Sequence, residues 1–381
     1  MEKILNSNLT ETESNTRNIG IDLLRIVSML MVVILHILGH GGIIETCPPL
    51  SLNHDLTWLL RIICFGAVDL FALTTGYVYA KQNFKYSKII MLWLSVLFYS
   101  AGIALIYFLF TDVYIGIKTL IKSFLPIMTK QYWYFTAYFC LFLFIPFINK
   151  LLSGLSKNNY KKLILIGLCA FCIVAWLGIM FGIDTFGLGN GYSFLWLMFL
   201  YLIGAYIKTY EIDFKKHSKN KHILLFVITC LTTYILSTIL DIVKYKISGS
   251  FGSRTTLICY ISPFIVFASI QLFLFFSKLQ LTKYSKIITK ISLASFGIYL
   301  ISEHPIIRAN FITDKFCNVA SDSYFTIIPK ILIYAILIYI ICTIIEFGRL
   351  YLFKKINLSS YCESIINKNK KLYKKLINKI P

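Results

Sequence analysis

Ten long apolar runs, joined by short polar stretches, make up most of the chain. Each run is long enough to cross a bilayer as a helix. Only a helix or a closed barrel satisfies its backbone hydrogen bonds in lipid, and runs this long and continuous indicate helices. We therefore predict an all-α, polytopic transmembrane helix bundle of about ten spans. The predicted spans are 19–39, 56–80, 88–110, 131–149, 162–182, 191–207, 222–241, 256–277, 291–312 and 325–347.

The sequence divides into one membrane domain and two polar ends. We expect an N-terminal tail at 1–18, a transmembrane domain at 19–347 and a basic tail at 348–381. The first tail has no apolar stretch with a small-residue cleavage site, so we predict that the first run is a retained helix. The last tail has two interpretations, an amphipathic helix on the membrane surface or a solvated basic tail. Its apolar residues at near-helical spacing are Ile365, Leu372, Leu376 and Ile380.

Lysine and arginine are concentrated in alternate loops. Both ends of the chain, together with the loops at 81–88, 150–162, 208–221 and 278–290, hold 27 Lys and Arg residues, and the opposite loops hold 7. Cytoplasmic loops carry such an excess of positive charge. We therefore predict a multi-pass protein of the cell (plasma) membrane with both termini in the cytoplasm.

Composition supports the membrane prediction and changes how the charge is interpreted. The chain is 57% hydrophobic and 14% charged, with a mean hydropathy of +0.73, which is more apolar than a soluble domain. A net charge of +21 would indicate nucleic-acid binding in a soluble protein. Here the lysines flank apolar runs, and no phosphate-binding loop, RNA-binding motif or zinc-finger spacing is present. We therefore expect contacts with membrane lipids and none with nucleic acid.

The first run contains three charged or titratable residues. Arg25 and His36 are eleven residues apart, so both lie on one helix face, separated by a rise of about 16 Å. Asp22 precedes Arg25 by three residues and is placed to pair with it. In one interpretation Arg25 snorkels to the cytoplasmic headgroups and His36 lies at the outer interface. The shared face favours a second interpretation, a polar stripe that faces the bundle interior or a wet cavity.

The second and fourth spans add further polar and aromatic groups. Asp69 falls near the middle of the second span, where a carboxylate needs a partner. Arg25 and His36 are the natural candidates, and the interaction is either functional or a structural ion pair between helices. Trp133 and Tyr134 open the fourth span and have two interpretations, an interfacial aromatic belt or the lining of a sugar pocket.

The ninth span is interrupted by polar residues. Glu303, His304 and Pro305 follow one another, and Arg308 lies one turn beyond. Proline leaves a backbone carbonyl unpaired, and an irregular helix is tolerated in a membrane where it is buried in protein or lines a water-filled cavity. We therefore predict that Glu303 or His304 faces a functional pocket.

Several stretches resemble the acyltransferase 3 family, integral membrane acyltransferases that modify bacterial surface glycans. The stretch VDLFALTTGY at 68–77 resembles the family's VDLFFxxSGY, and SFGIYLISEHPIIR at 295–308 resembles FGxYLIHxxP. The family places a histidine where this chain has Ser302, which leaves open whether His304 substitutes for it. The first-helix motif R-N-x3-D-x2-R-x10-H is matched by Arg17, Asn18, Asp22, Arg25 and His36.

The resemblance, which covers roughly 17–347, implies transfer of an acyl group, often acetyl, from cytoplasmic acyl-CoA to a hydroxyl of an extracytoplasmic or lipid-linked glycan. We expect acyl-CoA to be a co-substrate, with no permanently bound cofactor and no metal. We expect a stand-alone membrane domain without an SGNH domain, because the chain ends at residue 381. Which glycan accepts the group, and whether it is acetyl, succinyl or longer, stays open.

The residues suggest a division of labour. We expect Arg25 to hold a phosphate or carbonyl oxygen of the donor and His36 to act as general base on the acceptor hydroxyl, with a covalent acyl-histidine as an open variant. Support by orientation or proton transfer would come from Asp69, Glu303 and His304. The candidate substrate-binding residues are Asp22, Trp133, Tyr134 and Arg308.

A transporter is the alternative function. A non-enzymatic glycan or lipid transporter with a buried His/Glu proton relay would have the same helices and the same buried charges. Transporters often contain internal repeats with two broken helices. The sequence shows one clear interruption, at 303–305, which favours the enzyme.

Overall fold

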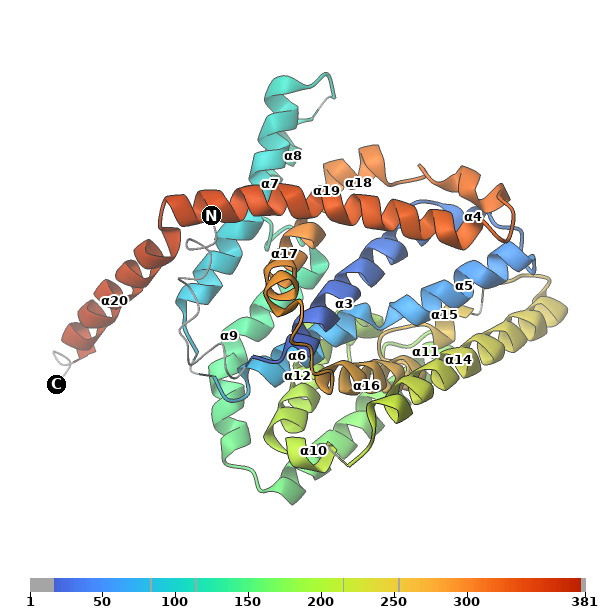
Figure 1. Ribbon diagram of the computed structural model, residues 1–381, viewed down its shortest axis with the longest axis horizontal. Coiled ribbons are helices and arrows are strands. Elements are labelled where there is room, and N and C mark those ends of the chain that lie inside the picture. The colour runs from blue at the N-terminus through green and yellow to red at the C-terminus, as the bar shows by residue number, and fades with distance from the viewer. Residues whose placement is uncertain (1–16, 83, 114, 215, 253, 378–381) are drawn as a thin grey trace.

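The computed structural model is a bundle of helices (Figure 1). It describes residues 17–82, 84–113, 115–214, 216–252 and 254–377, and no β-strand occurs among these residues. The predicted all-α fold class is therefore confirmed.

All ten predicted apolar runs are mainly helical. They correspond to α3 (Ile19–Leu38), α5 (Leu52–Phe65) with α6 (Ala67–Tyr79), α7 (Ser87–Phe110), α9 (Trp133–Ser153), α10 (Lys157–Gly167) with η2 (Leu168–Val174) and α11 (Ala175–Met180), α12 (Phe194–Thr209), α14 (Lys219–Ser248), α16 (Pro263–Ser277), α17 (Ser285–Ser302) with α18 (Pro305–Phe311), and α19 (Ile327–Lys355). The connections contain α4 (Ile43–Thr46), α8 (Ile117–Ser123), η3 (Gly189–Gly191), α13 (Glu211–Phe214), α15 (Arg254–Leu257) and η4 (Cys317–Ser321), and α20 (Leu358–Ile377) follows the last span.

Length and apolarity make this an integral membrane protein. Within the described ranges, seven helical stretches are long and apolar enough to cross a bilayer. Two further apolar helices, α12 and α16, are shorter. The figure of about ten spans and the cytoplasmic position of both termini stay predictions.

Helix α3 lies inside the bundle and packs against α5, α6, α16, α17 and α19 (Figure 1). Asn18 fixes its start, because the Asn18 side chain accepts a hydrogen bond from the Ile21 amide at 3.3 Å and donates one to the Ser277 carbonyl at 2.8 Å. The first bond caps α3, and the second ties it to the end of α16. The polar face of α3 is thereby held in the centre of the protein.

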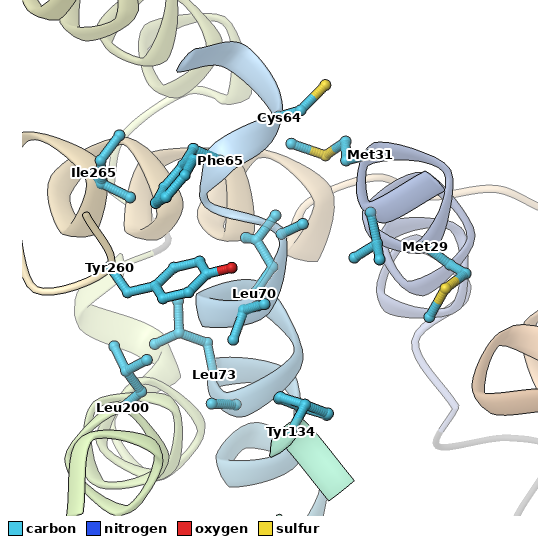
Figure 2. Packing of buried hydrophobic residues seen from close by; sticks show 14 of the residues in the cluster. Met29, Met31, Cys64, Phe65, Leu70, Leu73, Tyr134, Leu200, Tyr260 and Ile265 are labelled. Carbon is cyan, nitrogen blue, oxygen red and sulfur yellow. The ribbon is translucent and has the colours of Figure 1, made fainter. Parts of the chain in front are cut away.

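Helices α6 and α12 approach each other closely through two glycines. A Cβ atom on Gly76 would lie 2.1 Å from the Tyr201 carbonyl oxygen, and one on Gly204 would lie 2.0 Å from the Leu73 carbonyl oxygen. Small residues allow such backbone contact between membrane helices. Figure 2 shows apolar side chains from this region, such as Leu73 and Leu200, in the same core.

Two spans are interrupted. The predicted break in the ninth span is observed, because α17 ends at Ser302 and α18 begins at Pro305. A second break, which the sequence did not reveal, separates α5 from α6 at Gly66. A Cβ atom there would lie 2.3 Å from the Ser269 hydroxyl oxygen, so the turn packs directly against α16.

The basic tail begins as a helix. Helix α20 extends away from the bundle (Figure 1), and its Cys362 is buried against Met91 of α7. Helical conformation through Ile377 agrees with the first of the two interpretations, whereas Ile380 lies outside the described residues. Contact of this helix with a membrane surface stays a prediction.

Candidate active site

A cavity of about 810 Å³ lies beside α3. Aliphatic and aromatic side chains form most of its wall, and eight arginine, histidine, aspartate and glutamate side chains face it. These eight are Arg25, His36, His40, Glu45, Arg61, Glu303, Arg308 and Asp314. A mostly apolar cavity with a few convergent polar groups is the usual form of a small-molecule site.

Arg25 and His36 line this one cavity. Arg25 lies near the start of α3, and His36 lies in its last turn. As the eleven-residue spacing predicted, the two side chains lie on one face of α3, with a rise of about 16 Å between them. His40, just beyond the end of α3, lines the cavity as well.

Glu303 brings several groups together at the His36 end of the cavity. Its Oε2 lies 3.0 Å from His36 Nε2, and its Oε1 lies 3.8 Å from His40 Nε2. Arg308 donates to the same Oε1. The break after α17 makes this possible, because Glu303 is the residue at which the helix ends. The carboxylate is buried and is balanced by the Arg308 cation.

His40 is the more exposed of the two histidines. Burial lowers the pKa of His40 below its ordinary value, Glu303 raises it, and the nearby His36, Arg308 and Arg61 lower it further. Arg61 lines the same cavity as His40. His40 is thus mostly neutral at neutral pH.

Asp22 organises the start of α3 rather than the cavity. It accepts two hydrogen bonds from Arg17, at 2.6 and 3.0 Å, and one from Thr289 at 3.3 Å. The predicted contact with Arg25 is present but longer, at 3.5 Å. Asp22 does not line the cavity, so its place is behind Arg25 and not against a substrate.

The prediction that Asp69 pairs with Arg25 or His36 was wrong. Asp69 is fully buried in the first turn of α6 and accepts a hydrogen bond at 3.1 Å from Trp196 Nε1 of α12. Neither Arg25 nor His36 contacts it, and it is absent from the cavity lining. The tight α6–α12 packing turns this carboxyl toward α12, where it joins two helices.

His304 also lies away from the cavity. Its Nδ1 accepts a hydrogen bond from the Ile306 amide at 3.2 Å, which caps α18, and its Nε2 lies 3.2 Å from the Ser100 carbonyl oxygen. Both ring nitrogens therefore interact with backbone. The structure gives His304 the place of a helix cap and puts Glu303, its neighbour, in the cavity.

Aromatic residues form part of the cavity wall. Trp133 and Tyr134 line it together with Tyr138, Tyr192 and Tyr260. Of the two interpretations of Trp133 and Tyr134, their place in the structure favours a pocket lining.

Sequence reasoning missed Arg61, Glu45 and Asp314, all in the lining. Arg61 carried a usable signal, because a charged residue inside an apolar run indicates function by default. Glu45 and Asp314 follow or precede spans in loops, where acidic residues are common and carry little information.

The cluster at Glu303 also has the composition of a metal site. His36, His40 and Glu303 offer ligand atoms that all lie within 4.8 Å of one another. Arg308, however, contacts the same carboxylate, and a cation in that position opposes a divalent ion. The arrangement therefore favours acid–base chemistry.

Comparison with known proteins identifies the family. The family model described as an acyltransferase domain (acyltransferase 3) matches residues 18–347, which is most of the chain. Neither curated proteins nor solved structures gave a match. The matched region contains the whole cavity and begins at the asparagine that caps α3. The chain belongs to the acyltransferase 3 family.

Proposed function

We propose that this membrane acyltransferase moves an acyl group, most simply acetyl, from cytoplasmic acyl-CoA to a hydroxyl of an extracytoplasmic or lipid-linked glycan. The family supports the acyltransferase class. One observation carries the finer statement: a single cavity has Arg25 at one end and the His36–Glu303 pair at the other. With the predicted orientation, the arginine faces the cytoplasmic donor and the histidine faces the external acceptor.

Arg25 is suited to binding the donor. A guanidinium binds phosphate or a carbonyl oxygen through several N–H groups, and its Asp22 contact at 3.5 Å is weak because Arg17 holds Asp22 more closely. The rise of about 16 Å between Arg25 and His36 accommodates an elongated thioester along the apolar wall. The acyl carbonyl then reaches the His36 end.

His36 is suited to activating the acceptor. It takes the proton of the acceptor hydroxyl while the oxygen attacks the thioester carbonyl carbon, so that a C–O bond forms and the C–S bond breaks. Glu303, 3.0 Å from His36 Nε2, stabilises the resulting imidazolium. The proton then passes to the departing CoA thiolate. In the covalent variant His36 carries the acyl group before the hydroxyl attacks.

Acyl-CoA turnover by purified protein in nanodiscs tests this function. We expect His36→Ala to lower kcat at least about 100-fold, and Arg25→Ala to raise KM for acyl-CoA about tenfold. His217→Ala, at an exposed histidine outside the cavity, is the matched control and retains wild-type turnover. Wild-type turnover in folded His36→Ala protein would overturn the general-base role.

The transporter alternative gains one observation, the second interrupted helix at Gly66. The same assay separates the two functions. A transporter binds or moves its cargo without consuming acyl-CoA, whereas the proposed enzyme releases free CoA.

A further inference from the structure

Arg61 is a half-buried cation, and the proposed reaction gives it no role. It lies on α5 and lines the cavity. Its guanidinium lies 5.0 Å from the Trp58 ring centroid and 5.7 Å from that of Phe65. Its Nε is buried and has no hydrogen-bond partner. The two rings hold the guanidinium in place, and its hydrogen-bonding capacity stays available.

The other arginines of the cavity lining have carboxylate partners. Arg25 contacts Asp22, and Arg308 contacts Glu303. Arg61 alone among the lining arginines forms no ion pair in the part of the chain that the structure describes, although Glu45 lines the same cavity. A half-buried guanidinium with an unpartnered buried Nε favours a counter-charge. An anionic ligand group is the natural complement.

An aromatic wall stands next to Arg61. The Phe65 and Tyr260 rings stack with centroids 4.8 Å apart, Tyr260 and Tyr192 are 5.0 Å apart, and Tyr192 and Trp133 are 4.4 Å apart. Figure 2 shows Phe65 and Tyr260 beside each other. The four rings therefore contact one another in series and all line the cavity, and an aromatic face suits the C–H-rich face of a pyranose.

The backbone of the Tyr192 loop is shaped for this surface. Gly191 has φ +99°, and a Cβ atom there would lie 2.4 Å from Tyr260 Cβ. Only glycine adopts this conformation at low cost and permits the close approach. The loop thus presses Tyr192 against Tyr260 and fixes the wall beside the arginine.

We propose that Arg61 and the wall formed by Phe65, Tyr260, Tyr192 and Trp133 bind a sugar ring that bears a carboxylate or phosphate. This rests on the proposed function for the statement that the sugar is the acyl acceptor. The subsite opens onto the same cavity as His36, because Arg61 and all four rings line that cavity. The acceptor is therefore an acidic glycan and not a neutral one.

Calorimetric titration of wild-type protein in nanodiscs tests the proposal with three probes that share one ring. The probes are methyl β-glucuronide, the phosphate ester of methyl β-glucoside and neutral methyl β-glucoside. We expect at least one anionic probe to bind about tenfold more tightly than the neutral one. The preferred anion distinguishes carboxylate from phosphate. Equal affinity for all three would overturn the proposal.

Substitutions of Arg61 test whether this residue causes the preference for anionic probes. We expect Arg61→Gln to remove the preference. Arg61→Lys retains part of it, because lysine keeps the charge but lacks the planar guanidinium. Lys330→Gln, at an exposed lysine outside the cavity, keeps it. Retention of the preference in Arg61→Gln would contradict the assignment. If Arg61→Gln does not fold, the wild-type probe series and Arg61→Lys decide.

Acyl-CoA turnover, measured on the same samples, separates this proposal from the proposed function. Turnover without any preference for anionic sugars leaves the acyltransferase intact and overturns the acidic subsite. Preference without turnover supports the subsite and contradicts the acyltransferase.

Discussion

Glu303 is the residue on which the charges of the site converge. One of its oxygens lies 3.0 Å from His36, while the other contacts Arg308 and lies 3.8 Å from His40. A single buried carboxylate thereby lies next to the proposed base and is itself neutralised by an arginine. This pairing explains why a glutamate interrupts an otherwise apolar span.

We expect the Glu303 carboxylate to contribute to the chemical step and not to donor binding. We expect Glu303→Gln to lower kcat about 100-fold, because the His36 imidazolium loses its counter-charge, while KM for acyl-CoA stays near the wild-type value. Steady-state kinetics in nanodiscs measures both. Glu363→Gln, on the exposed face of α20, is the control. A Glu303→Gln enzyme with wild-type kcat would show that His36 acts without Glu303.

Residue-scale reasoning from the sequence succeeded where one helix supplied both residues. Arg25 and His36 share a cavity because helical spacing alone puts them on one face. It failed for Asp69, because the partner of a buried carboxylate depends on how neighbouring helices are rotated. Its hydrogen-bond donor, Trp196, lies 127 positions away in the sequence, so no local pattern indicates the contact.

The break between α17 and α18 depends on a histidine cap. The His304 ring accepts the Ile306 amide hydrogen bond, and asparagine at the same position supplies an acceptor too. We therefore expect His304→Asn to keep acyl-CoA turnover near the wild-type value, and His304→Ala to lower the free energy of unfolding by about 1 kcal/mol. Thermal unfolding and turnover assays measure the two effects. Loss of turnover in both variants, with folding intact, would instead assign His304 a catalytic role.

The contact between α6 and α12 should tolerate no side chain. Gly204→Ala would place a Cβ atom 2.0 Å from the Leu73 carbonyl oxygen, so we expect a loss of about 1–3 kcal/mol in stability. Gly102→Ala on α7 is the matched control, because nothing lies within 4 Å of its Cβ position. Unfolding temperatures of the two variants give the comparison. Equal temperatures would mean that the two helices separate without penalty.

At the scale of elements, the sequence predicted which segments are helices better than it predicted where those helices break. Each of the ten apolar runs is mainly helical, because continuous apolarity leaves few alternatives in lipid. The break at Pro305 was predicted, since proline cannot donate a backbone hydrogen bond. The break at Gly66 was missed, because a glycine in a span serves packing as readily as a turn.

At the scale of the whole molecule, the proposed function depends on the orientation of the protein in the membrane. The cavity distinguishes a donor end from an acceptor end only if the two ends of α3 face opposite sides of the membrane. We expect a membrane-impermeant maleimide to label Lys118→Cys in intact cells and Lys219→Cys only after lysis, because these lysines lie on opposite predicted sides. The unmodified chain gives the background from the native cysteines. The reverse pattern would invert the predicted topology.

The cavity wall itself could not be predicted from the sequence. Its charged residues come from the first, second and ninth spans and from loops, and Arg61 and Tyr192 come to line one cavity only in the packed bundle. A short motif determines which residues share a face of one helix, whereas a cavity wall is formed by several helices and loops together.

The proposed function requires His36 for the transfer of an acyl group to a surface glycan. Mass spectrometry of glycans extracted from cells that express wild-type, His36→Ala or His217→Ala protein tests it most directly. We expect the glycans to gain the mass of one acyl unit with wild-type and His217→Ala protein. With folded His36→Ala protein we expect no such gain. Glycans of the same mass from wild-type and His36→Ala cells would contradict the requirement for His36.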